Sequence, residues 1–360
     1  MSATVSVQQA PLDDRIVAEL TEFLAEQCQL LLRLGDDLTP FAEIAPDAVL
    51  GGKLLRPTFA YWGWRSVQPD GADGEPAMVR AAASLELLHA SALVHDDLID
   101  NSAIRRTRPA PHLRFADHSP PDRPDSAASF GRAGAVLLGD LLLSWSDQLF
   151  QAGIGLLAPQ RATAARAQYD LMRTEVVAGQ FLDVLAQARG AFDQPEALRV
   201  IELKTTKYTV QRPLLLGAVA AGAEQSVLAR LSDYGRSIGE AFQLRDDLLG
   251  VFGDPDKTGK PTNDDLREGK RTLLLALAYQ ALDEAGRSEL HEGVGRPGLT
   301  DPEADQLRAL IVGTGAPELV EQRIAASAEQ ARDCLAGAEL RPEARQMLLE
   351  LVDIATQRNS

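Results

Sequence analysis

Apolar residues recur every three or four positions along most of the chain, the spacing that places them on one face of an α-helix. Ala, Leu, Glu, Arg and Gln dominate these stretches, and alternating strand-like patterns are scarce. The pattern predicts helices over residues 14–34, 77–98, 133–150, 164–187, 225–251 and 317–335. No strand pair or hairpin is predicted, so the expected fold class is all-α.

Stretches rich in Gly, Pro and Asp interrupt this helical pattern. They cover residues 69–76, 117–126, 253–262 and 293–302. The composition does not change across any of them, and no repeat of fixed period is found. We therefore expect a flexible N-terminal segment over residues 1–15, followed by one domain over residues 16–360.

The composition is that of a folded protein with an acidic surface. Of 360 residues, 45% are hydrophobic and 24% charged, which allows a large core. The 52 acidic and 36 basic residues give a formal net charge of −16, which argues against nucleic-acid binding through a basic face. An anionic ligand would be repelled at long range, so local Lys and Arg side chains and a metal would have to capture it.

Cysteine usage and hydropathy indicate a soluble, cytoplasmic protein without stable membrane insertion. Cys28 and Cys334 do not form a CxxC pattern, which favours a reduced compartment. The N-terminal stretch lacks the basic and apolar regions of a signal peptide. Residues 213–223 are too short to span a bilayer, and Asp140 interrupts the apolar run over residues 137–143.

Two acidic clusters at the ends of apolar helical stretches carry the clearest chemical signal. They are DDLID at residues 96–100 and RDDLLGVFGD at residues 245–254. If two facing helices brought these carboxylates together, their repulsion would call for divalent cations and an anionic ligand. Oxygen donors without Cys or His favour Mg²⁺, which binds through one or two carboxylates and substrate phosphates. The clusters therefore predict metal-dependent handling of a diphosphate.

Basic and polar residues accompany both clusters. Arg105 and Arg106 follow the first one, and His89 lies nearly beneath Asp96 on the same helix face. Lysines near the second cluster suit phosphate oxygens. Taken alone, either cluster could be an ordinary solvated helix end. Smaller patches, each more often structural than functional by itself, are Lys53 with Arg56, Gln180 with Asp183, and Lys204 with Thr205 and Lys207.

Taken together and in order, these motifs resemble those of the trans-isoprenyl diphosphate synthases, the polyprenyl synthetase family. The matching strings are GGKLLRP, LELLHASALVHDDLID with two arginines beyond it, GQFLD, KTTKYT and AFQLRDD with GDPDKTGKP and DDLREGKRT. The resemblance covers nearly the whole chain and looks most like bacterial geranylgeranyl diphosphate synthases. It implies the isoprenoid synthase fold, a single large helical bundle around a central cavity, and a homodimer.

The resemblance also implies roles for individual residues. It assigns three Mg²⁺ per active site to the ligands Asp96, Asp97, Asp100, Asp183, Asp246 and Asp247. It assigns the allylic diphosphate to Arg105, Lys204, Thr205, Gln243 and Lys260, with Gln180 and Lys270 as further substrate-binding residues. It assigns isopentenyl diphosphate to Lys53, Arg56, His89 and Arg106. The implied catalytic set is Asp96, Asp97, Asp100, Arg105, Lys204, Asp246 and Lys260.

The implied reaction joins isopentenyl diphosphate to an allylic diphosphate and lengthens the chain by one isoprene unit. Magnesium would help the allylic diphosphate to leave, and water must be kept from the resulting cation. Two other functions stay open. A class I terpene cyclase would leave Lys53, Arg56 and Arg106 unexplained, because it needs no second diphosphate pocket. A non-catalytic partner subunit would be expected to have lost more of the aspartates.

The helix before the first cluster bears on product length. In the family, the fifth, eighth and eleventh positions before the first aspartate line the tunnel for the growing chain, and here they are Ser91, Leu88 and Leu85. Small Ser91 and Ala92 would leave the tunnel open as far as Leu88, one helical turn of about 5.4 Å further down. This suggests a C20 product. C15 or C25 and longer products stay open, as does the alternative that another helix closes the tunnel.

Two positions depart from the family pattern. Gly250 stands where the second motif usually has its third aspartate, and Asp254 is a candidate substitute that would act through water. Thr107 stands where Gly is common after the two arginines, and we expect it to stiffen that loop.

Overall fold

The computed structural model describes residues 11–120, 126–253 and 263–356, and its regular structure is almost entirely helical. This confirms the all-α prediction. The six predicted helices are present as α1 (Leu12–Leu34), α4 (Glu75–Ile99), α6 (Ala127–Ile154), α7 (Pro159–Arg189), α10 (Gln225–Phe252) and α16 (Ala316–Ala336). Helix α1 begins at Leu12, so the helix already includes the last residues of the predicted flexible segment.

Shorter elements connect and flank these helices. In the first half of the chain they are η2 (Asp36–Leu38), α2 (Thr39–Val49), α3 (Leu55–Arg65), β1 (Ile104–Arg105), β2 (Arg108–Pro109) and α5 (Pro111–Asp117). In the second half they are α8 (Gln194–Val200), the π-helix η4 (Ile201–Gln211), α9 (Arg212–Ala221), α12 (Asp264–Glu268), α13 (Leu273–Ala281), α14 (Glu284–Gly293), α15 (Asp301–Gly313) and α17 (Pro342–Thr356).

The pair β1–β2 corrects the expectation that no hairpin forms. Ile104 pairs with Pro109 and Arg105 with Arg108 in antiparallel register. The two residues between the strands have positive φ, +49° at Arg106 and +64° at Thr107, as a tight two-residue hairpin turn requires. Strands of two residues are too short to show an alternating pattern, so they could not be predicted from the sequence.

The backbone groups into two compact units. Unit 1 comprises the described residues up to Arg166 together with Gly217–Gly222, and unit 2 comprises Ala167–Leu216 and the described residues from Ala223 onward. The composition gave no sign of this grouping, because α7 and α9 each run through a boundary without a break in their helical pattern. The predicted single domain and central cavity stay predictions.

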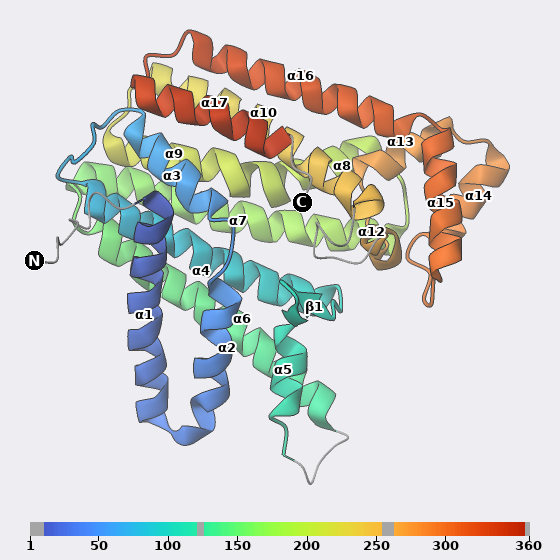
Figure 1. Cartoon of the computed structure of the whole chain (residues 1–360), viewed down its shortest axis with the longest axis horizontal. Helices are drawn as coiled ribbons and strands as arrows, with labels where there is room; N and C mark the ends of the chain where they lie inside the picture. Colours follow the sequence, from blue (N-terminus) through green and yellow to red (C-terminus); the bar gives the residue numbers. More distant parts are fainter. Residues whose placement is uncertain (1–10, 121–125, 254–262, 357–360) are drawn as a thin grey trace, which may run out of the picture. The chain divides into compact units, whose positions relative to one another are not determined.

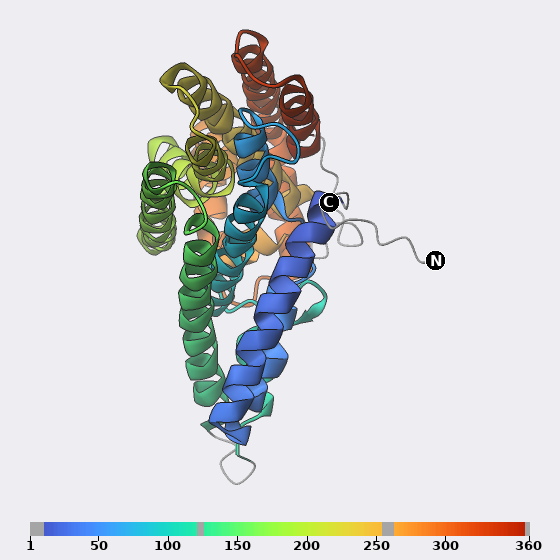
Figure 2. The same cartoon turned by 90° about the vertical axis from the view of Figure 1, so that its left-hand side faces the viewer.

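Unit 1 is built on the close packing of α4 against α6. Gly153 of α6 makes this possible, because a Cβ there would lie 2.6 Å from the backbone nitrogen of Ala81 in α4. Helices α1 and α2 form an antiparallel pair joined by a short turn (Figure 1). Figure 2 shows α1 and α6 over their full length, and Phe23 of α1 meets the edge of Trp145 of α6. The packing fixes α4, which carries the first acidic cluster.

Unit 2 is built on α10, which packs against η4, α16 and α17 (Figure 1). Two glycines bring backbones into direct contact. A Cβ at Gly239 of α10 would lie 2.7 Å from the Cα of Thr206 in η4, and one at Gly179 of α7 would lie 2.4 Å from the backbone nitrogen of Lys204. These contacts hold α7, η4 and α10 together, and each of the three carries one of the motifs found in the sequence.

Within the described residues, α4 and α6 are long and apolar enough to cross a membrane by length and composition alone. In α4, 78% of the apolar window is buried inside the structure, as in the core helix of a globular protein. In α6 the buried share is only 33%, so this helix keeps an exposed apolar face.

Candidate active site

The first aspartate cluster lies at the C-terminal end of α4, in unit 1. Asp97 is buried and accepts hydrogen bonds from the guanidinium of Arg105 in β1, with Nε 2.9 Å from Oδ1. Burial raises the pKa of Asp97, although its bonds with Arg105 act in the opposite direction. The hairpin thus folds back and places a guanidinium on the aspartate cluster.

The turn of the hairpin is strained and anchors Arg106. Thr107, a β-branched residue, adopts the left-handed conformation, which costs about 1–3 kcal/mol. Arg106 Nη1 donates to the carbonyl of Leu50 at 2.7 Å, next to the last residue of α2. The Thr107 position expected to stiffen the loop is therefore part of a turn with two successive left-handed residues.

The residues predicted to bind isopentenyl diphosphate also belong to unit 1. Arg56 in α3 is buried and His89 in α4 is half-buried, whereas Lys53 is exposed in the loop before α3. Burial lowers the pKa of His89 far below its usual range, and the charges of Arg56 and Arg106 lower it further. The imidazole is therefore neutral at neutral pH, and the positive charge of this pocket comes from its arginines.

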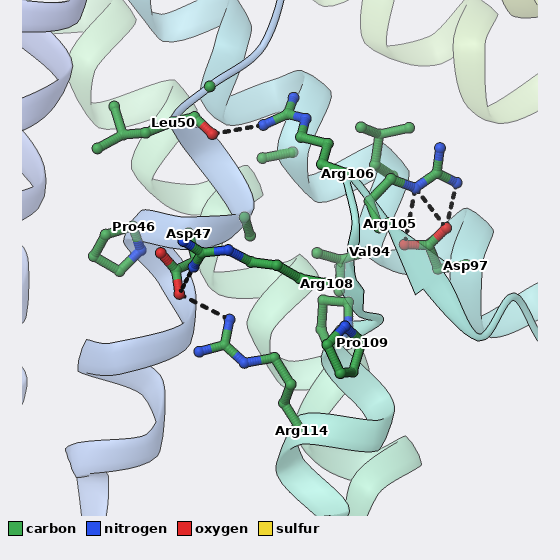
Figure 3. Close-up of a pocket in the computed structure, with 15 residues that line it drawn as sticks. Pro46, Asp47, Leu50, Val94, Asp97, Arg105, Arg106, Arg108, Pro109 and Arg114 are labelled. Atoms are coloured by element: carbon green, nitrogen blue, oxygen red, sulfur yellow. Dashed lines mark hydrogen bonds and ion pairs between the residues drawn. The ribbon is translucent and has the colours of Figure 1, made fainter. Parts of the chain in front are cut away.

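A cavity of about 390 Å³ opens between α2, α4 and the hairpin (Figure 3). Arg105 and Arg106 line it together with Asp97. At its far side, Arg108 and Arg114 converge on Asp47, at 2.5 and 3.1 Å. The cavity therefore presents several guanidiniums beside the first aspartate cluster.

The residues predicted to set product length do not line this cavity. Ser91, Leu88 and Leu85 are buried in unit 1, and Ala92 is half-buried. The hydroxyl of Ser91 donates to the carbonyl of Gly139 in α6 at 2.8 Å. Ser91 therefore contacts the α6 backbone directly.

The second aspartate cluster lies near the C-terminal end of α10, in unit 2. Asp247 is buried; its Oδ1 accepts from Gln243 Nε2 at 2.7 Å, and its Oδ2 has no hydrogen-bond partner among the described residues. Burial raises the pKa of Asp247 well above its usual range, and nearby Asp265 and Asp246 raise it further. Thr205 of η4 donates to the side-chain carbonyl of Gln243.

The motifs GQFLD and KTTKYT meet in unit 2. Lys204 Nζ of η4 lies 2.7 Å from Oδ2 of Asp183, which is buried in α7. Gln180 is half-buried one turn before Asp183. Together with the Thr205–Gln243 bond, this contact joins residues of α7, η4 and α10 that are far apart in the sequence.

Asp265 is a site residue that the sequence reasoning missed. A Cβ at Gly250 would lie 2.0 Å from Oδ2 of Asp265, so this carboxylate occupies the space of the absent third aspartate side chain. Lys270 Nζ lies 3.2 Å from Asp265 and 2.5 Å from Glu268, which gives this predicted substrate ligand two carboxylate partners. Asp254 and Lys260 lie outside the described residues.

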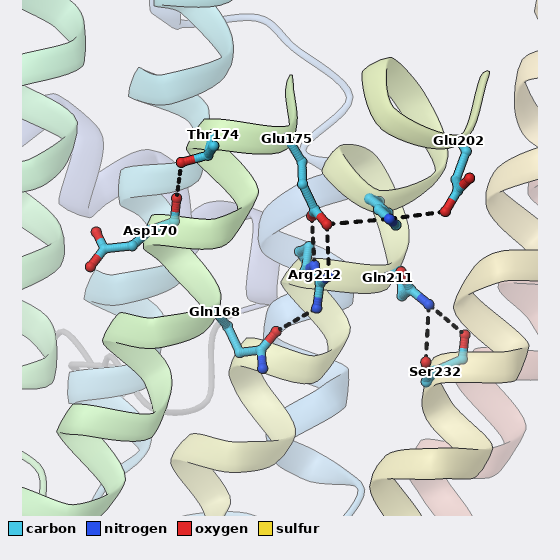
Figure 4. Close-up of polar contacts among 9 residues, drawn as sticks. Gln168, Asp170, Thr174, Glu175, Glu202, Gln211, Arg212 and Ser232 are labelled. Atoms are coloured by element: carbon cyan, nitrogen blue, oxygen red, sulfur yellow. Dashed lines mark hydrogen bonds and ion pairs between the residues drawn. The ribbon is translucent and has the colours of Figure 1, made fainter. Parts of the chain in front are cut away.

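A network of charged side chains that connects η4 with α7 and Arg212 was also not predicted from the sequence (Figure 4). Arg212 makes a bidentate pair with Glu175 of α7, at 2.7 and 2.8 Å, and its Nη1 donates to Gln168. Lys207 of η4 bridges Glu175 and Glu202, at 3.3 and 2.9 Å. Burial raises the pKa of Glu175, but Arg212 and Lys207 outweigh burial and hold it below its usual range. The network ties η4 to α7.

The donor set of these clusters suits magnesium. Among the described residues, no group of three His, Cys, Asp or Glu side chains is arranged to hold a metal ion by itself. Mg²⁺ needs only one or two carboxylates and completes its shell with water and phosphate oxygens. Adjacent carboxylates in each cluster, and the unpartnered Oδ2 of Asp247, fit this requirement.

Comparisons with known proteins agree with these features. A sequence model described as polyprenyl synthetase matches residues 39–311. The chain is 30% identical to the geranylfarnesyl diphosphate synthase of Aeropyrum pernix, over 88% of this chain and 96% of that protein. It is 34% identical to a (2E,6E)-farnesyl diphosphate synthase of Mycobacterium tuberculosis, over 80% of this chain and 73% of that protein. The crystal structure of geranylgeranyl pyrophosphate synthase from Corynebacterium glutamicum, complexed with isoprenyl diphosphate and magnesium, matches with a TM-score of 0.89 and 36% identity, covering 96% of this chain and 98% of that one.

Proposed function

The chain belongs to the polyprenyl synthetase family and is a prenyl diphosphate synthase, and we propose that it condenses isopentenyl diphosphate with an allylic diphosphate in a magnesium-dependent reaction. The proposed product is a linear all-trans prenyl diphosphate, mainly C20 geranylgeranyl diphosphate. We further propose that residues 16–360 act as one polyprenyl synthetase domain.

The observation that supports this function best is the basic pocket beside the first aspartate cluster. Arg56, His89 and Arg106 lie close enough for their charges to interact, whereas Asp97 pairs directly with the neighbouring Arg105. Two arginines can hold one diphosphate by charge-assisted hydrogen bonds. A terpene cyclase, which ionises a single diphosphate, has no use for this second pocket. We assign it, with Lys53, to isopentenyl diphosphate.

We assign the allylic diphosphate to the polar side chains that surround the two aspartate clusters. In unit 1 the ligand is Arg105. In unit 2 they are Lys204, Thr205 and Gln243, together with Lys260, which lies outside the described residues. We propose Gln180 and Lys270 as further substrate-binding residues. Lys204 already lies 2.7 Å from Asp183, and a lysine beside a metal-binding carboxylate is suitably placed to meet a phosphate oxygen.

The proposed metal ligands are Asp96, Asp97, Asp100, Asp183, Asp246 and Asp247, for three Mg²⁺ ions. When bound, magnesium would neutralise the allylic diphosphate and make it a better leaving group. The protein's own residues orient the two diphosphates and exclude water from the allylic cation. The proton released when the new carbon–carbon bond forms would go to the departed diphosphate.

The proposed product length rests on the small side chains at Ser91 and Ala92, with Leu88 one turn further down α4. The names of the matched relatives range from farnesyl to geranylfarnesyl diphosphate synthase, so C15 and C25 products are the alternatives. The exposed apolar face of α6 supports a homodimer, because a second copy would cover it. We propose a soluble dimer in the cytoplasm.

The function is tested by incubating the purified protein with isopentenyl diphosphate, Mg²⁺ and each allylic primer in turn. We expect a linear C20 diphosphate on mass analysis, and no product when EDTA is in excess. A hydrocarbon product would show a cyclase, and absence of turnover with every primer would show a non-catalytic subunit. Full condensation rates in excess EDTA, or after Asp96→Ala with Asp246→Ala, would contradict the metal mechanism.

A further inference from the structure

Glu86 is a buried carboxylate that the proposed reaction leaves without a role. It lies on α4, one turn before His89, and only 1% of its surface is exposed. Its Oε2 has no hydrogen-bond partner among the described residues. A buried carboxylate without such partners is costly unless opposite charges lie nearby. The charges that act on Glu86 are those of Arg56 and Arg106, both assigned to isopentenyl diphosphate.

Gly52 lies next to both Glu86 and Arg106. A Cβ at Gly52 would lie 3.0 Å from Glu86 Oε2 and 2.8 Å from Arg106 Nη2, so both groups close over the same point of the GGKLLRP loop. On the other side of its guanidinium, Arg106 donates to the carbonyl of Leu50. Arg106 therefore bonds to the chain at the end of α2 and feels the charge of the carboxylate on α4.

Arg106 also has a competing partner. The charge of Asp97, like that of Glu86, acts on it, and Asp97 already binds Arg105. Without Glu86, the guanidinium of Arg106 would be drawn toward Asp97 in the aspartate cluster. The carboxylate of Glu86 supplies an opposing attraction toward the loop before α3.

We propose that Glu86 is a positioning residue of the isopentenyl diphosphate pocket, whose fixed carboxylate holds Arg106 and Arg56 in the orientation that receives the diphosphate. This inference rests on the function proposed above. It deepens that function by naming a residue that touches no substrate and acts through the arginines. Because guanidinium forks bind phosphate with directional hydrogen bonds, their orientation matters as well as their charge.

Charge alone predicts the opposite change in affinity, so an experiment can separate the two explanations. A carboxylate in a pocket for an anion should repel that anion, so its removal should tighten binding. Burial raises the pKa of Glu86, although Arg56 and Arg106 act against burial. We expect positioning to outweigh this repulsion, because the charges of Arg56 and Arg106 offset that of Glu86.

The test substitution is Glu86→Gln, which keeps the size of the side chain and removes its charge. We expect KM for isopentenyl diphosphate to rise about tenfold, with kcat and the allylic KM within about twofold, because only one substrate uses these arginines. The matched control is Glu75→Gln, which removes an equally buried carboxylate from the same helix. Glu75 pairs with Arg15 at 2.6 Å, so this control should lower the melting temperature and leave KM unchanged.

Two further measurements separate positioning from structural damage. If Glu86 acts through Arg106, Glu86→Gln should add little to the effect of Arg106→Met in a double-mutant cycle. Gly52→Ala should reproduce the rise in KM while keeping the charge, because its methyl group would displace both side chains. It also provides the test if Glu86→Gln does not fold.

An unchanged or lower KM in Glu86→Gln or Gly52→Ala, or additive effects in the cycle, would overturn the inference. Calorimetric titration with isopentenyl diphosphate gives the same comparison without turnover. Thus, if the wild-type protein makes no prenyl diphosphate, the proposed function fails on its own, and the affinities of the variants still decide the role of Glu86.

Discussion

The carboxylate of Asp265 fills the space that a side chain at Gly250 would occupy. The second motif lacks its third carboxylate at position 250, and the carboxylate of Asp265 lies against that glycine. Asp265 also acts on Asp247 through its charge. The cluster therefore regains a carboxylate from an element 15 residues further along the chain, and we expect Asp265 to contribute to metal binding.

Restoring the sequence motif with Gly250→Asp should damage the protein. The new Cβ would lie 2.0 Å from Asp265 Oδ2, so one carboxylate must move and two acids come into contact. We expect a loss of about 1–3 kcal/mol in the free energy of unfolding, measured by denaturant titration. Adding Asp265→Gly should recover most of this loss. Gly313, around which no atom would lie within 4 Å of a Cβ, is the control, and Gly313→Ala should not destabilise.

Ser91 tests the assignment of product length. Its hydroxyl donates to the Gly139 carbonyl, so α6 leaves no room for a ring on that side. A phenyl group in Ser91→Phe must therefore turn away from α6, and we expect it to block the growing chain and shorten the main product from C20 to C15. Ser91→Ala, which stays small, should keep C20. Mass analysis of the products decides, and C20 from Ser91→Phe would refute this assignment.

The π-helix η4 is stabilised by charged contacts with its neighbours. Glu175→Gln keeps the shape of the side chain but leaves Arg212 and Lys207 without their shared carboxylate. Both partners in the Arg212–Glu175 pair are largely buried, so we expect a loss of about 3 kcal/mol in unfolding free energy. Glu202→Gln is the control, because Glu202 is half exposed and its pair with Lys207 should contribute little.

The same pair gives a pH dependence with a definite sign. The pKa of Glu175 is lower in the folded protein than in the unfolded chain, because Arg212 and Lys207 outweigh burial. Its contribution is therefore present above the unfolded pKa of about 4.3 and is lost as pH falls through the folded value. Denaturant titrations at descending pH should show wild type and Glu175→Gln converging. A difference in stability that is constant over this acidic range would contradict the assignment.

Element types followed from the sequence wherever a pattern was long enough to repeat. The six long helices show apolar residues at helical spacing over several turns, and all six are present. The hairpin at Arg106 and Thr107 depends on two backbone angles, and η4 depends on its hydrogen-bond register; neither leaves a periodic signal. Asp183 with Lys204 could be proposed from motifs, whereas Asp265, Glu175 and Glu86 required knowledge of contacts made in three dimensions.

For the molecule as a whole, a net negative charge opposes the binding of anionic substrates, and the local arrangement of charge overcomes this. The net charge of −16 is spread over many surface carboxylates, whereas Arg56, Arg105 and Arg106 gather in one part of unit 1. Screening limits the surface repulsion to about 8 Å at physiological salt, while charges in a partly buried pocket are screened much less. Capture of a diphosphate therefore depends on the pocket rather than on overall charge.

We expect one surface helix, α6, to determine the oligomeric state of the protein. Helix α6 exposes Phe130, Val136 and Leu137, and 57% of the Leu137 surface is accessible. Exposed apolar side chains on one helix are typical of a protein–protein interface, and we expect a second copy of the chain to cover them. Leu137→Glu would place a charge in that interface, so light scattering after size exclusion should show one chain of 38.8 kDa instead of two. Leu319→Glu, at a comparably exposed leucine of α16, should leave the dimer intact. A Leu137→Glu protein with the mass of two chains would show that this face of α6 does not join the subunits.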